Sequence, residues 1–191
     1  MSNSSVVNVE VATKVSKYDK FVLEEELKNF LNNISPAQLQ NRENLFINIS
    51  GQDESLYSLV SSIYLEKATG AQWDFESQKP EFYFFKPSRR EAEIESFEDG
   101  GGDSEEVPAS NHWILPSMEF LTLWENLVYE DGLKEKILKF TESAIVFAKH
   151  NVNHNIISCN RIILLHGPPG TGKTSLCKAI AQKLSIRLNS V

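Results

Sequence analysis

The sequence predicts an α/β protein in which a small N-terminal α+β domain precedes the start of a phosphate-loop nucleotide-binding core. Three observations predict this organisation. Strand and helix patterns alternate over residues 1–90, acidic residues and glycines dominate residues 91–110, and residues 111–191 contain a glycine-rich loop between a strand pattern and a helix pattern. Because alternating elements pack as layers around one core, we expect two folded regions joined by a flexible linker.

The first region opens with a half-buried strand, predicted from the alternation of Val7, Val9 and Val11 with polar residues. Residues 20–32 predict a helix whose apolar side includes Phe21 and Leu31. Residues 44–50 predict a second strand around Phe46 and Ile47, followed by a turn at Gly51 and Asp53. A further helix is predicted from four apolar residues at helical spacing, Leu56, Val60, Ile63 and Tyr64.

An aromatic run at residues 82–85 predicts a strand over Glu81–Lys86. Such a cluster serves either as part of a core or as a platform for stacking RNA bases. We favour the core, because only Lys86, Arg89 and Arg90 supply positive charge nearby and phosphate binding needs more. The next segment, residues 91–106, is acidic and contains Gly100, Gly101 and Gly102. It is expected to be a solvated tether rather than a lure for a basic partner, since its charges repel and it has little apolar area to bury.

The whole chain of 191 residues has a formal net charge of −7 and is 41% hydrophobic. This balance predicts packed cores but no direct nucleic-acid binding. No apolar run is long enough to span a bilayer, and the polar N-terminus has no signal-peptide core, so we expect no membrane association and a cytosolic or nuclear chain. In a reducing compartment, Cys159 and Cys177 are expected to be buried free thiols.

The second region begins with an extended segment at residues 112–116 and an apolar patch, Phe120, Leu123, Trp124, Leu127 and Tyr129. Asp131 is the expected N-cap of the next helix. That helix is predicted from an apolar stripe at helical spacing, formed by Leu133, Ile137, Phe140, Ala144 and Phe147. His150 and His154 are four residues apart, but without an obvious third ligand we expect surface histidines rather than a zinc site.

The most informative motif is G-x-x-x-x-G-K-[ST], the phosphate-binding loop of nucleoside triphosphatases. Its residues are Gly167, Pro168, Pro169, Gly170, Thr171, Gly172, Lys173 and Thr174. Backbone N–H groups in such a loop form a concave cradle for anions, and glycines let the backbone approach phosphate oxygens closely. We expect Lys173 to reach the β- and γ-phosphates of ATP and the Thr174 hydroxyl to ligate Mg²⁺.

The surroundings of the motif support this interpretation. Residues 161–165 are apolar and β-branched, as expected of a buried strand leading into the loop. After the loop, Leu176, Ala179, Ile180 and Leu184 predict a helix, whose N-terminal end would add positive potential to the site. Residues 185–188 are expected to open a further strand. A chance turn would not bring all of these features together.

From about Ser110 to Leu188 the chain resembles the pachytene checkpoint AAA+ ATPases, the group that includes the thyroid-receptor-interacting checkpoint ATPase of animals. The matching segments outside the loop are His112-Trp113-Ile114-Leu115-Pro116, Leu123-Trp124, Leu127-Val128-Tyr129, Asn151-Val152-Asn153, Asn160-Arg161, Leu164-Leu165-His166, Ser175-Leu176-Cys177-Lys178-Ala179, Ala181-Gln182-Lys183-Leu184 and Ile186-Arg187-Leu188. The loop alone would indicate only an AAA+-like protein, whereas the W-I-L-P and L-V-Y segments are more specific.

The resemblance implies a homohexameric ring that binds ATP and Mg²⁺ and remodels HORMA-domain proteins in meiotic chromosome and spindle-checkpoint control. It also implies that residues 1–90 engage the substrate or its adaptor, and that the protein acts in the nucleus, on chromosomes, and in the cytoplasm. Residues 111–191 would be the beginning of the large AAA+ subdomain. Leu127, Val128 and Tyr129 would lie near the adenine pocket.

Hydrolysis needs an acidic pair on a later strand, the Walker B motif, and an arginine from a neighbouring subunit. No catalytic residue of this kind precedes Val191, so we expect this chain by itself to be inactive. It would be a fragment, a prematurely spliced product or an incomplete gene model. The alternative function is a non-catalytic binding module that acts through its N-terminal domain. A small-molecule kinase is disfavoured by the W-I-L-P segment and by the separate N-terminal domain.

Overall fold

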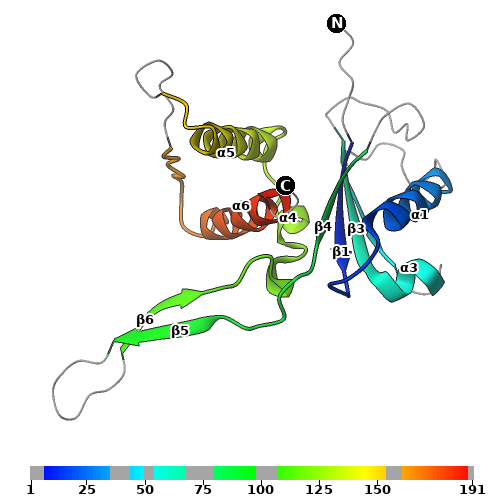
Figure 1. Ribbon diagram of the computed structural model, residues 1–191. Coiled ribbons are helices and arrows are strands. Elements are labelled where there is room, and N and C mark those ends of the chain that lie inside the picture. The colour runs from blue at the N-terminus through cyan, green and yellow to red at the C-terminus, as the bar shows by residue number, and fades with distance from the viewer. Residues whose placement is uncertain are drawn as a thin grey trace, which may run out of the picture. The chain divides into compact units, whose positions relative to one another are not determined.

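A computed structural model describes residues 7–34, 44–49, 54–67, 80–97, 107–153 and 161–188 (Figure 1). The fold is mixed α/β, as predicted. The chain divides into two compact units, one formed by Met1–Arg89 with Ile186–Val191 and the other by Arg90–Ser185. The predicted turn at Gly51 and Asp53 lies outside the described residues, as do His154 and Cys159.

The first unit contains a four-stranded sheet. Its strands are β1 (Val7–Thr13), β2 (Asn44–Asn48), β3 (Val60–Lys67) and β4 (Glu81–Phe85), in the order β2-β3-β1-β4. Strand β3 pairs antiparallel with both β1 and β2, whereas β4 pairs parallel with β1. The strands predicted around Val7, Phe46 and Phe82 are therefore confirmed.

Helix α1 (Lys20–Asn32) has the predicted bounds, and Asp19 caps it by accepting hydrogen bonds from the backbone N–H groups of Phe21 and Val22. Its buried side is formed by Leu23, Leu27 and Leu31. The prediction that Phe21 lies on this side was wrong, since Phe21 is 73% exposed. The spacing of four between the leucines keeps them on one face, and Phe21 falls outside it.

The helix predicted from Leu56 to Tyr64 is mostly a strand. Helix α3 (Glu54–Leu59) ends before Val60, where β3 begins. The stretch is rich in β-branched and aromatic residues, and β3 is an interior strand with neighbours on both sides. Pairing along both edges stabilises the extended form, so the apparent helical spacing of Val60, Ile63 and Tyr64 was misleading.

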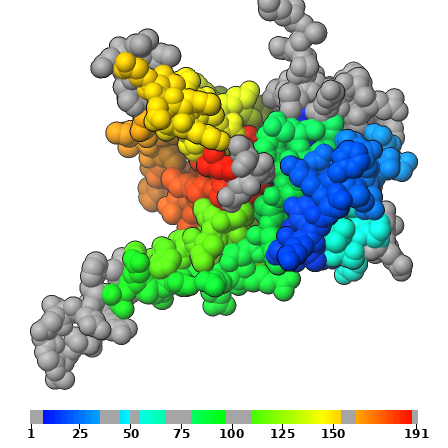
Figure 2. Space-filling view, viewed as in Figure 1, coloured from blue at the N-terminus to red at the C-terminus, as the bar shows by residue number. Residues whose placement is uncertain are grey.

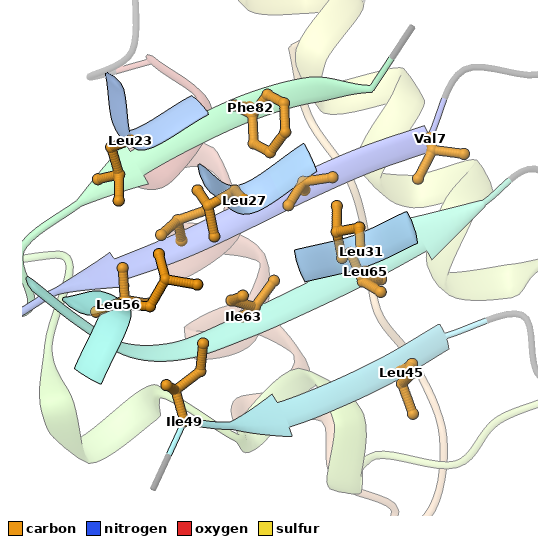
Figure 3. Close-up of a cluster of buried hydrophobic side chains, with 13 residues drawn as sticks. Val7, Leu23, Leu27, Leu31, Leu45, Ile49, Leu56, Ile63, Leu65 and Phe82 are labelled. Carbon is orange, nitrogen blue, oxygen red and sulfur yellow. The ribbon is translucent and has the colours of Figure 1, made fainter. Parts of the chain in front are cut away.

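The core of the first unit lies between one face of the sheet and the helices α1 and α3 (Figures 1 and 3). Figure 3 shows Leu23, Leu27 and Leu31 of α1 directed at the sheet, where they meet side chains such as Ile63, Leu65 and Phe82. Phe84 packs partly buried against this cluster, and Phe85 is buried. The structure thus places Phe82 in the core with Phe84 packed against it, as we favoured, and leaves Tyr83 half-buried.

Part of the segment expected to be a flexible tether forms a hairpin. Strand β5 (Glu93–Phe97) pairs antiparallel with β6 (Val107–His112), and Figure 2 shows this hairpin, in green, as a narrow arm. Backbone hydrogen bonds and cross-strand contacts, including Ser110 to Glu95 at 3.1 Å and His112 to Glu93 at 3.3 Å, offset the charge repulsion assumed from the sequence. Residues 98–106 lie outside the described residues.

The second unit also contains a 3₁₀ turn, η1 (Met118–Phe120), the helices α4 (Leu123–Asn126) and α5 (Leu133–Lys149), and α6 (Lys173–Leu188) as far as Ser185. The helix predicted from Leu133 onward is confirmed. Its N-cap is Gly132, with φ 79°, and not Asp131 as expected, because the chain enters the helix through a left-handed residue. Of the predicted stripe, Ile137 is buried, whereas Leu133 and Phe140 remain exposed.

Two predicted strands beside the loop are absent from the described residues. Residues 161–165 form no regular element, and Ile162 and Leu164 are 86% and 82% exposed. A strand is stable only when its backbone pairs with a neighbour, and none of the described strands pairs with this segment. Residues 185–188 continue α6 instead, since a helix satisfies its backbone hydrogen bonds locally.

Two predictions from composition concern the described residues directly. No described helix combines the length and apolar character needed to cross a bilayer. Cys177 is a free thiol, as expected, but it is exposed rather than buried. It lies on the open side of α6, whereas Leu176 and Ala179 occupy the buried side.

Candidate nucleotide-binding site

The predicted phosphate loop, Gly167–Thr174, leads directly into the N-terminus of α6. The helix begins at Lys173, and its first turn is closed by a hydrogen bond of 2.8 Å from the backbone N–H of Leu176 to the carbonyl of Gly172. The first N–H groups of a helix have no partner within the helix and carry its positive end. The local sequence therefore places N–H groups that lack an intrahelical partner where the loop ends.

Lys173 folds back over the loop that precedes it. Its Nζ donates to the carbonyl oxygens of Gly167 and Pro168, at 3.0 and 2.6 Å, and contacts the Thr171 hydroxyl at 3.2 Å. Thr171 Oγ1 in turn donates to the carbonyl of Pro168, at 2.9 Å. These bonds close the loop into a ring with the ammonium group at its mouth. A polyphosphate bound there would meet a positive charge that is already positioned.

Two glycines give the loop its concave form. Gly170 and Gly172 have φ values of 79° and 76°, which residues with a Cβ rarely adopt. A Cβ on Gly170 would have no heavy atom within 4 Å, so the space beside its backbone is open. Successive backbone N–H groups beside an open space form the type of concavity that binds anions.

The residues of the loop fit the triphosphate and metal that the motif predicts. The open backbone at Gly170 and the ammonium group of Lys173 suit a polyanion, and the exposed Thr174 offers a hydroxyl oxygen, which Mg²⁺ accepts as a ligand. All eight predicted site residues lie together at this one end of α6.

Tyr129 also contacts the loop, although it lies far from it in the sequence. Its hydroxyl lies 3.0 Å from the carbonyl oxygen of Gly172 and 3.2 Å from that of Thr171. A Cβ on Gly172 would lie 2.7 Å from the same hydroxyl and 3.5 Å from Leu127 Cδ2. Sequence reasoning associated Tyr129 with the adenine pocket and missed this contact, because nothing local links residues that are 43 positions apart.

Aromatic residues of the preceding segment hold α6 in place. The rings of Trp113 and Phe120 pack at 5.4 Å, and Lys178 of α6 lies 4.1 Å above the Trp113 ring. Cation–π contacts of this type contribute about 0.5–1 kcal/mol at partly exposed positions. The W-I-L-P segment therefore serves the site by supporting the helix that follows the loop.

Trp124 anchors the same helix nearer its end. Its side chain is buried, with Lys134 of α5 at 5.0 Å and Lys183 of α6 at 5.7 Å from its ring. Lys134 Nζ also donates to the carbonyls of Trp124 and Leu127, at 2.8 and 2.9 Å, and so caps the C-terminus of α4. Trp124 thereby connects α4, α5 and α6.

The histidines form no competing site within the part of the chain that the structure describes. There, no group of three or more His, Cys, Asp or Glu side chains is placed to hold a metal ion. His150 is exposed, and its predicted companion His154 lies outside the described ranges.

Comparisons with known proteins agree with this picture. The family described as "ATPase family associated with various cellular activities (AAA)" matches residues 163–191. A pachytene checkpoint protein 2 homologue of Arabidopsis thaliana is 67% identical over 84 residues, which are 44% of this chain and 18% of the relative. The human homologue is 54% identical over 88 residues, which are 46% of this chain and 20% of the relative.

A solved structure extends the likeness to nearly the whole chain. The structure titled "Structure of C. elegans PCH-2" matches with a TM-score of 0.68 and 28% identity, covering 96% of this chain and 46% of that one. The chain thus spans less than half of the solved relative. The matches confirm the resemblance to pachytene checkpoint ATPases and the predicted fold class, with AAA sequence at residues 163–191.

Proposed function

We propose that this protein binds ATP and Mg²⁺ through Gly167–Thr174 and uses hydrolysis to remodel HORMA-domain proteins in meiotic chromosome and spindle-checkpoint control. The observation that carries the nucleotide part is the closed ring in which Lys173 Nζ spans the loop at the N-terminus of α6. The match to the AAA ATPase family supports ATP hydrolysis, and the pachytene checkpoint relatives support a role in checkpoint control. The HORMA-domain substrate is what the family resemblance implies.

In this proposal the phosphate loop binds ATP, and other parts of the hexamer supply the groups that hydrolyse it. The N–H groups of the loop hold the phosphates, Lys173 neutralises their charge and Thr174 ligates Mg²⁺. The acidic pair that positions water, and the arginine that a neighbouring subunit supplies, belong to a homohexameric assembly. Residues 1–90 would engage the HORMA-domain substrate or its adaptor. The protein would act on chromosomes in the nucleus and also in the cytoplasm.

The direct test is ATP turnover and nucleotide affinity of the full-length protein and its Lys173→Ala variant. The variant should lose a charge-assisted contact worth about 1.5–3 kcal/mol, or roughly 10- to 150-fold in affinity for MgATP. Lys139→Ala is the control, since it also removes one lysine of the second unit but at an exposed position of α5 outside the loop. Unchanged turnover in the Lys173 variant would contradict the proposal.

A second candidate is a binding module without catalysis, acting through the N-terminal unit. It is favoured by one contrast: that unit has a closed core, whereas Ile162 and Leu164 beside the loop are exposed. Calorimetry of the 191-residue chain distinguishes the two functions. MgATP binding together with cooperative melting of residues 111–191 would contradict the binding-module function for this chain.

A further inference from the structure

We propose that Tyr129 is a positioning residue of the nucleotide site, which aims the backbone N–H groups of Gly172 and Lys173 into the phosphate cradle. This inference rests on the proposed nucleotide binding and adds a residue outside the loop motif. The contact that motivates it is the phenol oxygen between two successive loop carbonyls, those of Thr171 and Gly172.

Peptide geometry converts this contact into an orientation. In a planar trans peptide the C=O and N–H bonds point in opposite directions. The carbonyl of Thr171 shares a peptide unit with the N–H of Gly172, and the carbonyl of Gly172 shares one with the N–H of Lys173. The single O–H of Tyr129 is within bonding distance of both carbonyls and is shared between them. Sharing it restrains both peptide planes, with the two N–H groups facing away from the phenol.

Without such a partner, rotating these peptide planes to the opposite orientation would cost little free energy. Glycine populates positive and negative φ almost equally, so the planes flanking Gly172 can rotate more freely than others. A hydrogen bond of 3.0 Å to the Gly172 carbonyl opposes that rotation, and the N–H of Leu176 donates to the same oxygen at 2.8 Å. Both donors favour the orientation that presents N–H groups to an anion.

Tyr129 is itself held by neighbouring elements. It follows Leu127, whose carbonyl accepts a hydrogen bond of 2.9 Å from Lys134 of α5. The same Lys134 Nζ donates to Trp124, which is buried. The phenol therefore extends from an anchored segment. Because its own position is fixed, it restrains the loop instead of moving with it.

The test compares Tyr129→Phe with the wild-type full-length protein, using isothermal titration with MgADP and with MgATP. Backbone N–H groups of the loop contact phosphates that both nucleotides carry. We expect affinity to fall about three- to tenfold for both ligands, and by the same factor, corresponding to loss of one hydrogen bond of ordinary strength. Tyr57→Phe, which changes an exposed tyrosine of the first unit, should bind as wild type.

Two further measurements separate positioning from general stability. The melting temperature of nucleotide-free Tyr129→Phe should match that of the wild type, and the amide ¹H and ¹⁵N resonances of Gly172 and Lys173 should shift. A drop in melting temperature that accounts for the weaker binding would overturn the inference.

The remaining outcomes are also distinct. Wild-type affinity in Tyr129→Phe overturns this inference and leaves the proposed function standing, provided that Lys173→Ala binds weakly. A loss confined to MgATP overturns it as well, because it would place the effect at the γ-phosphate. If the wild-type protein binds neither nucleotide, both proposals fall.

Discussion

Gln182 and Ser117 form a paired hydrogen bond that resembles one step of a β-ladder. The Oε1 atom of Gln182 accepts from the backbone N–H of Ser117 at 2.9 Å, and its Nε2 donates to the backbone carbonyl of Ser117 at 3.0 Å. Both residues are buried. A side chain of α6 thus satisfies the backbone of the segment that enters η1.

Replacing this amide should destabilise the second unit. Gln182→Ala leaves a buried donor and a buried acceptor of Ser117 without partners, each at a cost of about 1–3 kcal/mol, so we expect a loss of roughly 2–6 kcal/mol in unfolding free energy. Gln182→Glu keeps the acceptor for the Ser117 N–H but loses the donor and buries a carboxylate against the Ser117 carbonyl, so it should be destabilised as well. Urea denaturation of the three proteins measures both effects, and equal stability of Gln182→Ala and wild type would refute the role of this pair.

In the first unit, Leu27→Ala and Phe21→Ala should behave very differently although both lie on α1. Leu27 is completely buried, so its truncation leaves a cavity and should cost about 2–5 kcal/mol. Phe21 is 73% exposed, and its truncation should change stability by about 0.5 kcal/mol or less. Chemical denaturation measures the stability of the two variants. Comparable losses of unfolding free energy would indicate that Phe21 belongs to the buried side of α1, as the sequence predicted.

Tyr18 makes the stability of the same unit sensitive to alkaline pH. Burial against the core and beside Phe84, at 5.6 Å between ring centroids, raises the pKa of the Tyr18 phenol above its usual value of 10.0. In the unfolded chain the phenol ionises at lower pH than in the folded one. Its contribution is therefore complete below the unfolded pKa and is lost as the pH rises through the folded pKa.

The variant Tyr18→Phe removes this titration. We expect the urea midpoint of the wild type to fall more steeply than that of the variant between about pH 9 and 11. Identical slopes over this interval would contradict the assignment to Tyr18. Comparing slopes rather than absolute midpoints removes the contribution of the lysines and other tyrosines, which are shared by both proteins.

Local patterns predicted the elements whose partners are close in sequence. The bounds of α1, the strand around Val7 and the entry of α6 at Lys173 all follow from alternation, helical spacing or the loop motif. The strand at Val60–Tyr64 was not predicted from its local pattern, because its apolar spacing fits a helix and a strand equally well. Its pairing with β1 and β2 decides between them, and that pairing joins residues far apart in the chain.

The same reason limits what sequence reveals about the site. The eight residues of the loop are contiguous, so a single motif finds them. The contacts of Tyr129 with Gly172 and of Lys134 with Trp124 and Leu127 depend on how separate segments pack, and no periodicity signals them. The strand predicted at residues 161–165 was wrong. Their composition favours a strand, but none of the described strands pairs with them.

The packing of Tyr129 on Gly172 predicts a sharp difference between two glycines with nearly the same backbone. Gly172 and Gly132 have φ values of 76° and 79°, so alanine at either position carries backbone strain of about 1–2 kcal/mol. Only at Gly172 would the new Cβ meet the Tyr129 hydroxyl, at 2.7 Å, whereas at Gly132 it would meet nothing within 4 Å.

We therefore expect Gly132→Ala to lower stability by about 1–2 kcal/mol without changing affinity for MgADP, and Gly172→Ala to abolish measurable binding. Adding Tyr129→Phe to Gly172→Ala removes the colliding oxygen and should restore part of the affinity. Isothermal titration of the single and double variants tests this, because strain alone would leave the double variant no better than Gly172→Ala. In that case the conformation of the loop would depend on its own dihedral angles and not on the contact with the Tyr129 phenol.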